Sequence, residues 1–309
     1  TQEQLDECTR PIGRRPNQPM FFLRCRDVRV EGIHILNAPC WTMSFVECED
    51  VRVTGLTIRN SEILPNNDGM HFCSCRKVFV RDCNITAGDD CIALSGITDW
   101  NRPCEDVVIS DCILTSCSKA IAIGYMHSIV RNVAISNCLI VDSNRALTIM
   151  ASARTGLVEN VLVSNTRGDT RIRAGHWGGC GEAVEIIANW HHLANYRDAA
   201  PADRFEVNVR NIRFQNLICT GENAIGIVGE GDNVQGVHFD NISMALKPSR
   251  NLPVKGRLID ASPGEQIARL PETGDFWLHV QGAGNVTFDG LDLAPVQGTM
   301  PGIHNPLGC

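Results

Sequence analysis

The chain has 309 residues, of which 43% are hydrophobic and 20% charged, with a formal net charge of −7 and a pI near 5.7. No global positive field exists to attract phosphates, so nucleic acid and anionic membrane surfaces are disfavoured as partners. No apolar run approaches the roughly 18–20 residues that a membrane-spanning helix needs. We therefore expect no nucleic-acid partner and no membrane partner.

Residues 1–8 lack the basic and apolar regions of a signal peptide, as a processed secreted chain also would. The fifteen cysteines are odd in number and form no matched Cys-x-x-Cys pairs, which makes a structural zinc site improbable. We expect mostly free thiols that pack as small hydrophobic side chains. Free thiols favour a reducing, cytoplasmic location, whereas secretion followed by processing is the alternative.

A short phrase recurs along the chain, beginning with Cys25-Arg-Asp-Val-Arg-Val30. Its copies centre on Val28, Val51, Val78, Val107, Val133, Val161, Ile212, Val237 and Val286. The first six copies are 23 to 29 residues apart. The interval from Val161 to Ile212 is 51 residues, or two periods, which predicts a degenerate copy between them.

Each phrase alternates apolar and polar residues, which predicts a strand with one buried face. A second strand begins shortly after each phrase, as at 82–85, 111–114 and 137–140, and a third precedes the next phrase, at 69–72, 91–94, 120–123, 146–149, 183–186 and 224–227. Three short strands per period of about 25 residues are typical of a parallel β-helix, whereas helical and leucine-rich repeats have other signatures. We predict an all-β fold, a right-handed parallel β-helix of about ten coils.

The predicted domain organisation is one β-helix domain over residues 1–309. Residues 1–20 would form a cap or extension, residues 21–290 the coils, and residues 291–309 an irregular tail. Segment 189–204 is expected to be a loop or short helix, which with the loop at 247–256 could wall one side of a groove.

Equivalent residues of successive coils should stack at about 4.8 Å, the spacing between neighbouring strands. This stacking predicts two cysteine columns, Cys25, Cys48, Cys75 and Cys104 in one and Cys83, Cys112 and Cys138 in the other. It also predicts a polar column immediately before the third strands: Asp68, Asp90, Lys119, Arg145, Glu182 and Asn223, preceded by Trp41. Asn67 and Asp89 lie one position earlier. Solvated turns explain a polar column in general, but not three carboxylates within two coils, because like charges repel and raise a pKa.

The motifs Asn66-Asn67-Asp68-Gly69 and Gly88-Asp89-Asp90-Cys91 resemble the Asn-x-Asp and Asp-Asp motifs of glycoside hydrolase family 28, the polygalacturonase and rhamnogalacturonase family. The flanking Arg15-Pro16 and residues 38–42 agree, and the resemblance is clear over about residues 14–125. It implies a pectin-lyase-like solenoid and hydrolysis with inversion. By the same resemblance, Asp89 would be the general acid, and Asp68 and Asp90 would position and deprotonate the attacking water. We expect neither a metal nor a cofactor.

The departures from the family pattern concern substrate binding. Lys119 stands where the family has the histidine of Gly-His-Gly, and Thr148-Ile149-Met150 stands where it has Arg-Ile-Lys. Arg145, or Arg171 and Arg173, could replace the missing cations. The candidate substrate-binding residues are Lys119, Arg145, Glu182, Trp177, His176 and Asn67. Trp177 could stack on a sugar or pack a loop, Glu182 could bind substrate or solvent, and His71 is expected to be structural.

The predicted substrate is a carbohydrate, a pectin-like or other acidic or deoxy-sugar glycan. A polysaccharide lyase or epimerase is the enzymatic alternative, with Lys119 or Arg145 as the base beside an aspartate-bound calcium ion. A catalytically inactive carbohydrate-binding solenoid is the other. No N-terminal segment like the family's capping phrase precedes Arg15. Residues 1–20, an oligomer or a partner chain could cover the first coil, or the chain could be part of a longer one.

Overall fold

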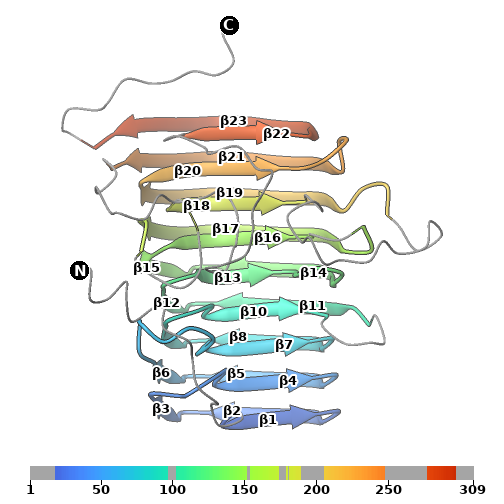
Figure 1. Ribbon diagram of the computed structural model, residues 1–309, viewed down its shortest axis with the longest axis vertical. Helices are drawn as coiled ribbons and strands as arrows, with labels where there is room; N and C mark the ends of the chain where they lie inside the picture. The colour runs from blue at the N-terminus through green and yellow to red at the C-terminus, as the bar shows by residue number, and fades with distance from the viewer. Residues whose placement is uncertain are drawn as a thin grey trace, which may run out of the picture.

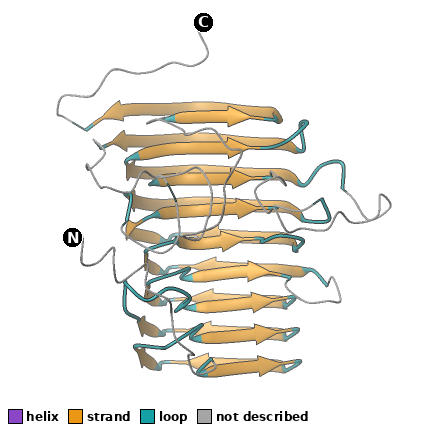
Figure 2. Ribbon diagram, viewed as in Figure 1, coloured by secondary structure: helices purple, strands orange, loops and turns teal. Residues whose placement is uncertain are grey.

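The computed structural model describes residues 18–96, 102–151, 154–173, 179, 181–188, 205–247 and 277–296. Within these ranges the chain forms 23 β-strands and no helix, and hence no helix that could cross a membrane (Figure 2). The strands stack as successive layers from β1 to β23 (Figure 1).

One strand from each coil enters a nine-stranded parallel sheet, here called the first sheet. In spatial order it contains β1 (Met20–Leu23), β4 (Met43–Val46), β7 (Met70–Cys73), β10 (Ile92–Ser95), β13 (Lys119–Ile123), β16 (Arg145–Met150), β18 (Glu182–Ile187), β20 (Asn223–Val228) and β22 (Leu278–Gln281).

The remaining strands form a second parallel sheet that returns the chain to the first. Early coils use two strands each: β2 (Arg26–Glu31) and β3 (His34–Leu36), β5 (Glu49–Thr54) and β6 (Thr57–Arg59), β8 (Arg76–Arg81) and β9 (Asn84–Ala87), β11 (Cys104–Ser110) and β12 (Ile113–Ser116), β14 (Ile129–Ser136) and β15 (Leu139–Ser143). Later coils merge the two into one long strand: β17 (Leu157–Thr170), β19 (Val209–Gly221), β21 (Val234–Leu246) and β23 (Ala283–Pro295). This arrangement confirms the predicted parallel β-helix, with nine coils in the described ranges.

The core consists of columns of identical or similar side chains. Phe45 stacks between Phe22 and Phe72 with ring centroids 4.8 and 4.9 Å apart. Backbone hydrogen bonds place both predicted cysteine columns on successive coils. All twelve described cysteines are free thiols, and most are buried. The cysteines therefore serve as packing groups within the described residues.

Seven of the nine copies of the recurrent phrase carry Asp or Asn before the central residue, and the backbone explains this choice. These residues, among them Asp106, Asn132, Asn160 and Asn211, have φ between 51° and 58°. Asn and Asp tolerate this left-handed region better than most other residues. Their side chains also hydrogen-bond from coil to coil, as from Asn132 Nδ2 to Asp106 Oδ1 at 3.0 Å. The phrase thus encodes a bend within each coil as well as a strand.

Two predictions are wrong, one about the number of coils and one about where the last coil ends. Val161 pairs directly with Ile212, so the 51-residue interval is a single coil with an insertion and contains no degenerate copy. The prediction counted residues along the chain, but a coil is added only where a strand pairs with a strand of the preceding coil. At the other end, β23 continues to Pro295, beyond residue 290, because Leu291 and Leu293 pair with Ile242 and Met244 of β21. The predicted features at 1–17, 189–204 and 248–256 lie outside the described residues.

Candidate active site

The predicted polar column exists and runs along the turn that leads into the first sheet. Gly69 N donates to Asp90 O at 2.9 Å, and Cys91 N donates to Lys119 O at 3.0 Å, so Asp68, Asp90 and Lys119 lie on adjacent coils. The register continues through Arg145, Glu182 and Asn223. Asp89 belongs to the same turn as Asp90. One carboxylate oxygen from each of Asp68, Asp89 and Asp90 lies within 4.8 Å of the others.

Each aspartate is held by different neighbours. Asp89 Oδ2 accepts a hydrogen bond from Asn66 N at 2.9 Å, and its Oδ1 accepts one from Asp90 N at 3.0 Å. Asp90 Oδ1 accepts from Lys119 N at 3.2 Å and lies 3.4 Å from Lys119 Nζ. Asp68 Oδ2 lies 2.8 Å from His71 Nε2. The three carboxyl groups are therefore fixed separately although they share one site.

Burial and mutual repulsion perturb the protonation of this cluster. All three aspartates are less than 10% exposed. Burial raises the pKa of Asp68 well above its usual range, and the charge of Asp90 raises it further. The pKa of Asp89 is also raised well above its usual range, first by burial and then by the charges of Asp68 and Asp90. A carboxyl group that keeps its proton towards neutral pH can act as a general acid.

His71 contacts the cluster directly, which the sequence analysis did not predict. It lies on β7 with its side chain on the outer face of the first sheet, since its neighbours Met70 and Phe72 are the core residues. Its ring stacks on Trp41 with centroids 3.7 Å apart and an interplanar angle of 7°. The three-residue spacing from Asp68 to His71 was available in the sequence, but it does not reveal that the side chains meet.

Lys119 lies where the sequence analysis placed it, beside the aspartates, and is 4% exposed. Arg145 differs from expectation. Its side chain has no exposed surface, and Nη1 donates to Glu185 Oε2 at 3.1 Å. The same oxygen accepts from Thr148 Oγ1 at 3.1 Å. Arg145 is thus neutralised and buried, because Glu185 lies on the outer face of the next coil, and this corrects the prediction that Arg145 lies open to substrate.

Asn67 and Glu182 are also fully buried. The carboxamide of Asn67 links two turns, since Oδ1 accepts from Gly88 N at 2.8 Å and Nδ2 donates to Ser61 O at 2.7 Å. Its substrate-binding prediction is therefore replaced by a role in joining the two aspartate-bearing turns. Glu182 enters β18 directly after Gly181, which has a φ of 78°. His176 and Trp177 lie outside the described residues.

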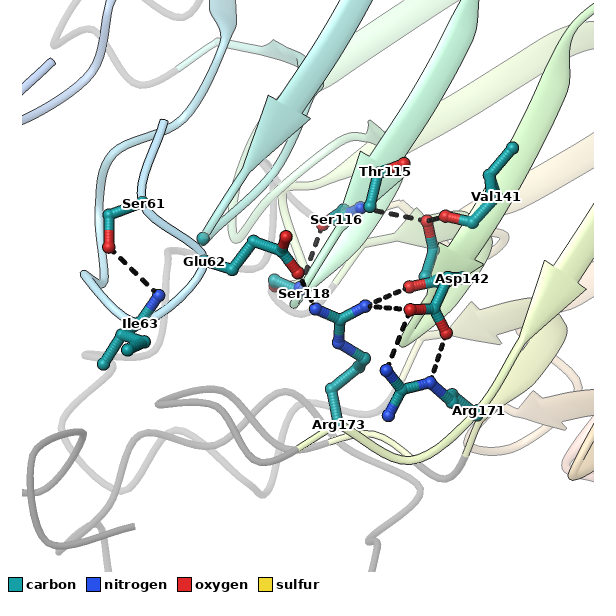
Figure 3. A network of polar contacts seen from close by, with 12 residues as sticks. Ser61, Glu62, Ile63, Thr115, Ser116, Ser118, Val141, Asp142, Arg171 and Arg173 are labelled. Atoms are coloured by element: carbon teal, nitrogen blue, oxygen red, sulfur yellow. Dashed lines mark hydrogen bonds and ion pairs between the residues drawn. The ribbon is translucent and has the colours of Figure 1, made fainter. Parts of the chain in front are cut away.

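An ion-pair network connects distant turns (Figure 3), one of which also holds Asp89 through Asn66 N. Arg173, which follows β17, contacts both Glu62 in the turn between β6 and β7 and Asp142 on β15. Arg171 Nη2 donates to Asp142 Oδ2 at 2.8 Å, and its Nε contacts Oδ1. Both arginines are therefore paired with carboxylates. We name Glu62, Asp142, Arg171 and Arg173 the flanking network.

Among the described residues, Asp68, Asp89 and Asp90 are also the group whose geometry could hold a metal ion. Oxygen ligands of this kind suit calcium or magnesium. The ammonium group of Lys119 already provides a positive charge next to Asp90. The arrangement is suited to moving protons among closely spaced carboxyl groups.

A solenoid with stacked aspartates at one turn defines a class of protein, the parallel β-helix with a polar site beside its first sheet. Residues 6–168, more than half of the chain, match the sequence profile of glycosyl hydrolases family 28. The chain belongs to this family, as the motifs around Asp68 and Asp89 predicted.

Relatives and solved structures agree with this placement. The chain is 28% identical over 146 residues to a Vitis vinifera protein named "Probable polygalacturonase", which covers 44% of this chain and 30% of that protein. It is 27% identical over 238 residues to a probable polygalacturonase of Arabidopsis thaliana, covering 70% of this chain and 44% of the relative. The chain therefore spans less than half the length of these curated relatives.

The fold resembles that of an exopolygalacturonase from Thermotoga maritima, with a TM-score of 0.60 and 24% identity over 80% of this chain and 56% of the other. A family 28 exopolygalacturonase from Yersinia enterocolitica gives a TM-score of 0.51 and 15% identity, over 87% of this chain and 42% of the other. The right-handed parallel β-helix is the fold of this chain.

Proposed function

We propose that the protein hydrolyses glycosidic bonds of a carbohydrate through Asp68, Asp89 and Asp90. The observation that carries this proposal is the meeting of three carboxylate oxygens within 4.8 Å on two adjacent coils. Glycoside hydrolysis needs one carboxyl group that donates a proton and another carboxylate that assists the nucleophile. Family membership supports the same reaction class.

In the proposed mechanism Asp89 protonates the departing glycosidic oxygen. Its raised pKa is what a general acid requires, but the pKa of Asp68 is raised as well, so the choice of Asp89 as the acid follows the family resemblance. Asp68 and Asp90 position the attacking water and remove its proton. Asp68 supports this assignment because its Oδ1 is buried and has no hydrogen-bond partner among the described residues.

We propose inversion at the anomeric carbon, following the family resemblance. Inverting enzymes usually separate their two carboxyl groups by about 6.5–9.5 Å, and retaining enzymes by about 5–5.5 Å. The closest oxygens of this cluster lie nearer than the inverting range. Proton NMR of the first product formed therefore provides the decisive measurement, because it reports the anomer before mutarotation.

The proposed substrate is a pectin-like or other acidic or deoxy-sugar glycan. The names of the relatives support a pectic substrate, whereas the pairing of Arg145 with Glu185 argues against a simple copy of a polygalacturonate site. Lys119 remains the proposed substrate-binding cation beside the aspartates. His176 and Trp177 stay candidate substrate contacts, whereas burial argues against the same role for Glu182, as it does for Arg145 and Asn67.

A panel of pectic, rhamnogalacturonan and neutral polysaccharides and their oligosaccharides tests the proposal, with new reducing ends as the readout. We expect release from at least one pectic glycan, and none by the Asp89→Asn variant. Product that absorbs ultraviolet light through a new double bond would instead identify a lyase. Binding without any product would identify an inactive carbohydrate-binding solenoid.

A further inference from the structure

His71 and Asp68 form a close polar contact within the site, and the proposed mechanism gives it no role. The two side chains are 7% and 4% exposed, and Nε2 lies 2.8 Å from Oδ2. A buried hydrogen bond of this length to a carboxyl group has a large influence on both its orientation and its charge.

The surroundings of His71 fix its ring. Trp41, on the preceding coil, stacks on one face at 3.7 Å and 7°. The strand register places Ser44 and Ala93 on either side of His71 on the outer face. These small side chains leave room for the imidazole, while packing inside the coil is done by Met70 and Phe72. His71 is thus held without contributing to the core.

Asp68 itself has two oxygens with different environments. Oδ2 is paired with His71, whereas Oδ1 is buried with no hydrogen-bond partner among the residues that the structure describes. A carboxylate anchored through one oxygen presents the other in a fixed direction. That second oxygen belongs to the residue assigned above to the attacking water.

We propose that His71 is a positioning residue for the hydrolysis, holding Asp68 through Oδ2 so that Oδ1 can receive the proton of the attacking water. This inference rests on the proposed function. In this role the Nε2–H of the imidazole donates to Oδ2, and His71 takes no part in the proton transfers of the reaction. As the water oxygen bonds to the anomeric carbon, one water proton moves to Asp68. The bond from that carbon to the glycosidic oxygen breaks, and Asp89 gives its own proton to the departing oxygen. The other charged groups at this site are Asp90 and Lys119.

The test compares His71→Leu, which removes the donor, with His71→Gln, whose amide nitrogen can occupy nearly the place of Nε2. On the best substrate of the panel, we expect His71→Leu to lower kcat about 10- to 100-fold, the range typical of a lost hydrogen bond to a charged group. KM should change less than about threefold, because the interaction is needed for chemistry and not for binding. His71→Gln should recover most of kcat.

The pH profile separates positioning from folding. Without the donor the anionic form of Asp68 is less stable, so the acidic limb of the kcat profile should move to higher pH in His71→Leu. The control is His238→Leu, which removes a surface histidine that contacts Thr287, far along the chain from the cluster. It should leave both kcat and the pH profile unchanged.

Wild-type activity that is lost in Asp89→Asn establishes the proposed function independently of His71. In that case, an unchanged kcat in His71→Leu overturns the inference. Equal losses in His71→Leu and His71→Gln, with a lower melting temperature and an unshifted acidic limb, also overturn it and make His71 structural. If the wild-type protein cleaves no glycan, the proposed function fails first and the inference falls with it.

Discussion

At the scale of single residues, the site concentrates negative charge where water has little access. Asp68, Asp89 and Asp90 are nearly buried, and the pKa values of Asp68 and Asp89 are raised by that burial and by neighbouring carboxylates. Groups of this kind commonly reduce stability in return for function. The loss of folding stability that these carboxyl groups cause should therefore depend on pH.

We predict that Asp68→Asn stabilises the protein at pH 7 and does so less at pH 4. Because the folded pKa of Asp68 is raised, the folded state binds more protons than the unfolded state above an unfolded pKa of about 3.9. The stability of the wild-type protein therefore falls as pH rises from about 4 through the raised pKa, and a neutral asparagine removes this loss. Thermal unfolding at both pH values measures the difference between variant and wild type. A difference that does not grow with pH would contradict the prediction.

The sequence predicted the position of these residues better than their contacts. Alternation and repeat spacing place Asp68, Asp90 and Lys119 in one column, because backbone pairing alone determines that register. The pairing of His71 with Asp68 and the burial of Arg145 against Glu185 depend on side-chain rotamers, which the repeat does not encode. For this reason the aspartate cluster could be predicted, whereas its supporting residues could not.

At the scale of elements, the turn between β6 and β7 connects the flanking network to the aspartates. Glu62 is held by Arg173, and four residues later Asn66 N donates to Asp89 Oδ2 at 2.9 Å. Arg173 is only 8% exposed, although its partners Glu62 and Asp142 are about half exposed. The turn is thus anchored at two points.

We predict that Arg173→Gln loosens this turn. A partly exposed ion pair within a network contributes on the order of 1 kcal/mol, so amide hydrogen exchange at residues 62–66 should accelerate about fivefold. Arg171→Gln is the matched control, because Arg171 pairs with Asp142 whereas the described ion pair of Glu62 is with Arg173 (Figure 3). Equal acceleration in both variants would show that the turn responds to general destabilisation.

Element boundaries show where a repeat misleads. The phrase predicts the strands well because the alternating residues and the position at positive φ, mostly Asp or Asn, recur in each copy. The interval between Val161 and Ile212 fails as a prediction because an insertion can have the length of a coil without adding one. Strand pairing, and not residue count, defines the coil number.

At the scale of the whole molecule, the coils are joined by continuous columns of core side chains. Phe45 has no exposed surface and stacks on aromatic rings of both neighbouring coils. Phe79, on the outer face of β8, is 37% exposed and lies 4.9 Å from the guanidinium carbon of Arg52. The two phenylalanines therefore differ in burial within the same part of the solenoid.

We predict that Phe45→Ala lowers the free energy of unfolding by about 3–5 kcal/mol, the usual cost of truncating a buried phenylalanine. Phe79→Ala should cost about 1 kcal/mol or less, because its ring is partly solvated and contributes one cation–π contact. Denaturant unfolding of both variants provides the comparison. Losses of similar size would mean that the aromatic column does not join the coils.

If the aspartate cluster cleaves glycosidic bonds with Asp89 as the acid, the effect of Asp89→Asn should depend on the leaving group. Asp89→Asn should lower the rate on natural linkages by about 10²–10⁴-fold or more, the contribution of general acid catalysis. A substrate with a very good leaving group needs no protonation and should be affected far less, whereas Asp68→Asn should impair both substrates alike. If Asp89→Asn slows both substrates equally while Asp68→Asn spares one of them, the acid and base roles are reversed and the account is contradicted.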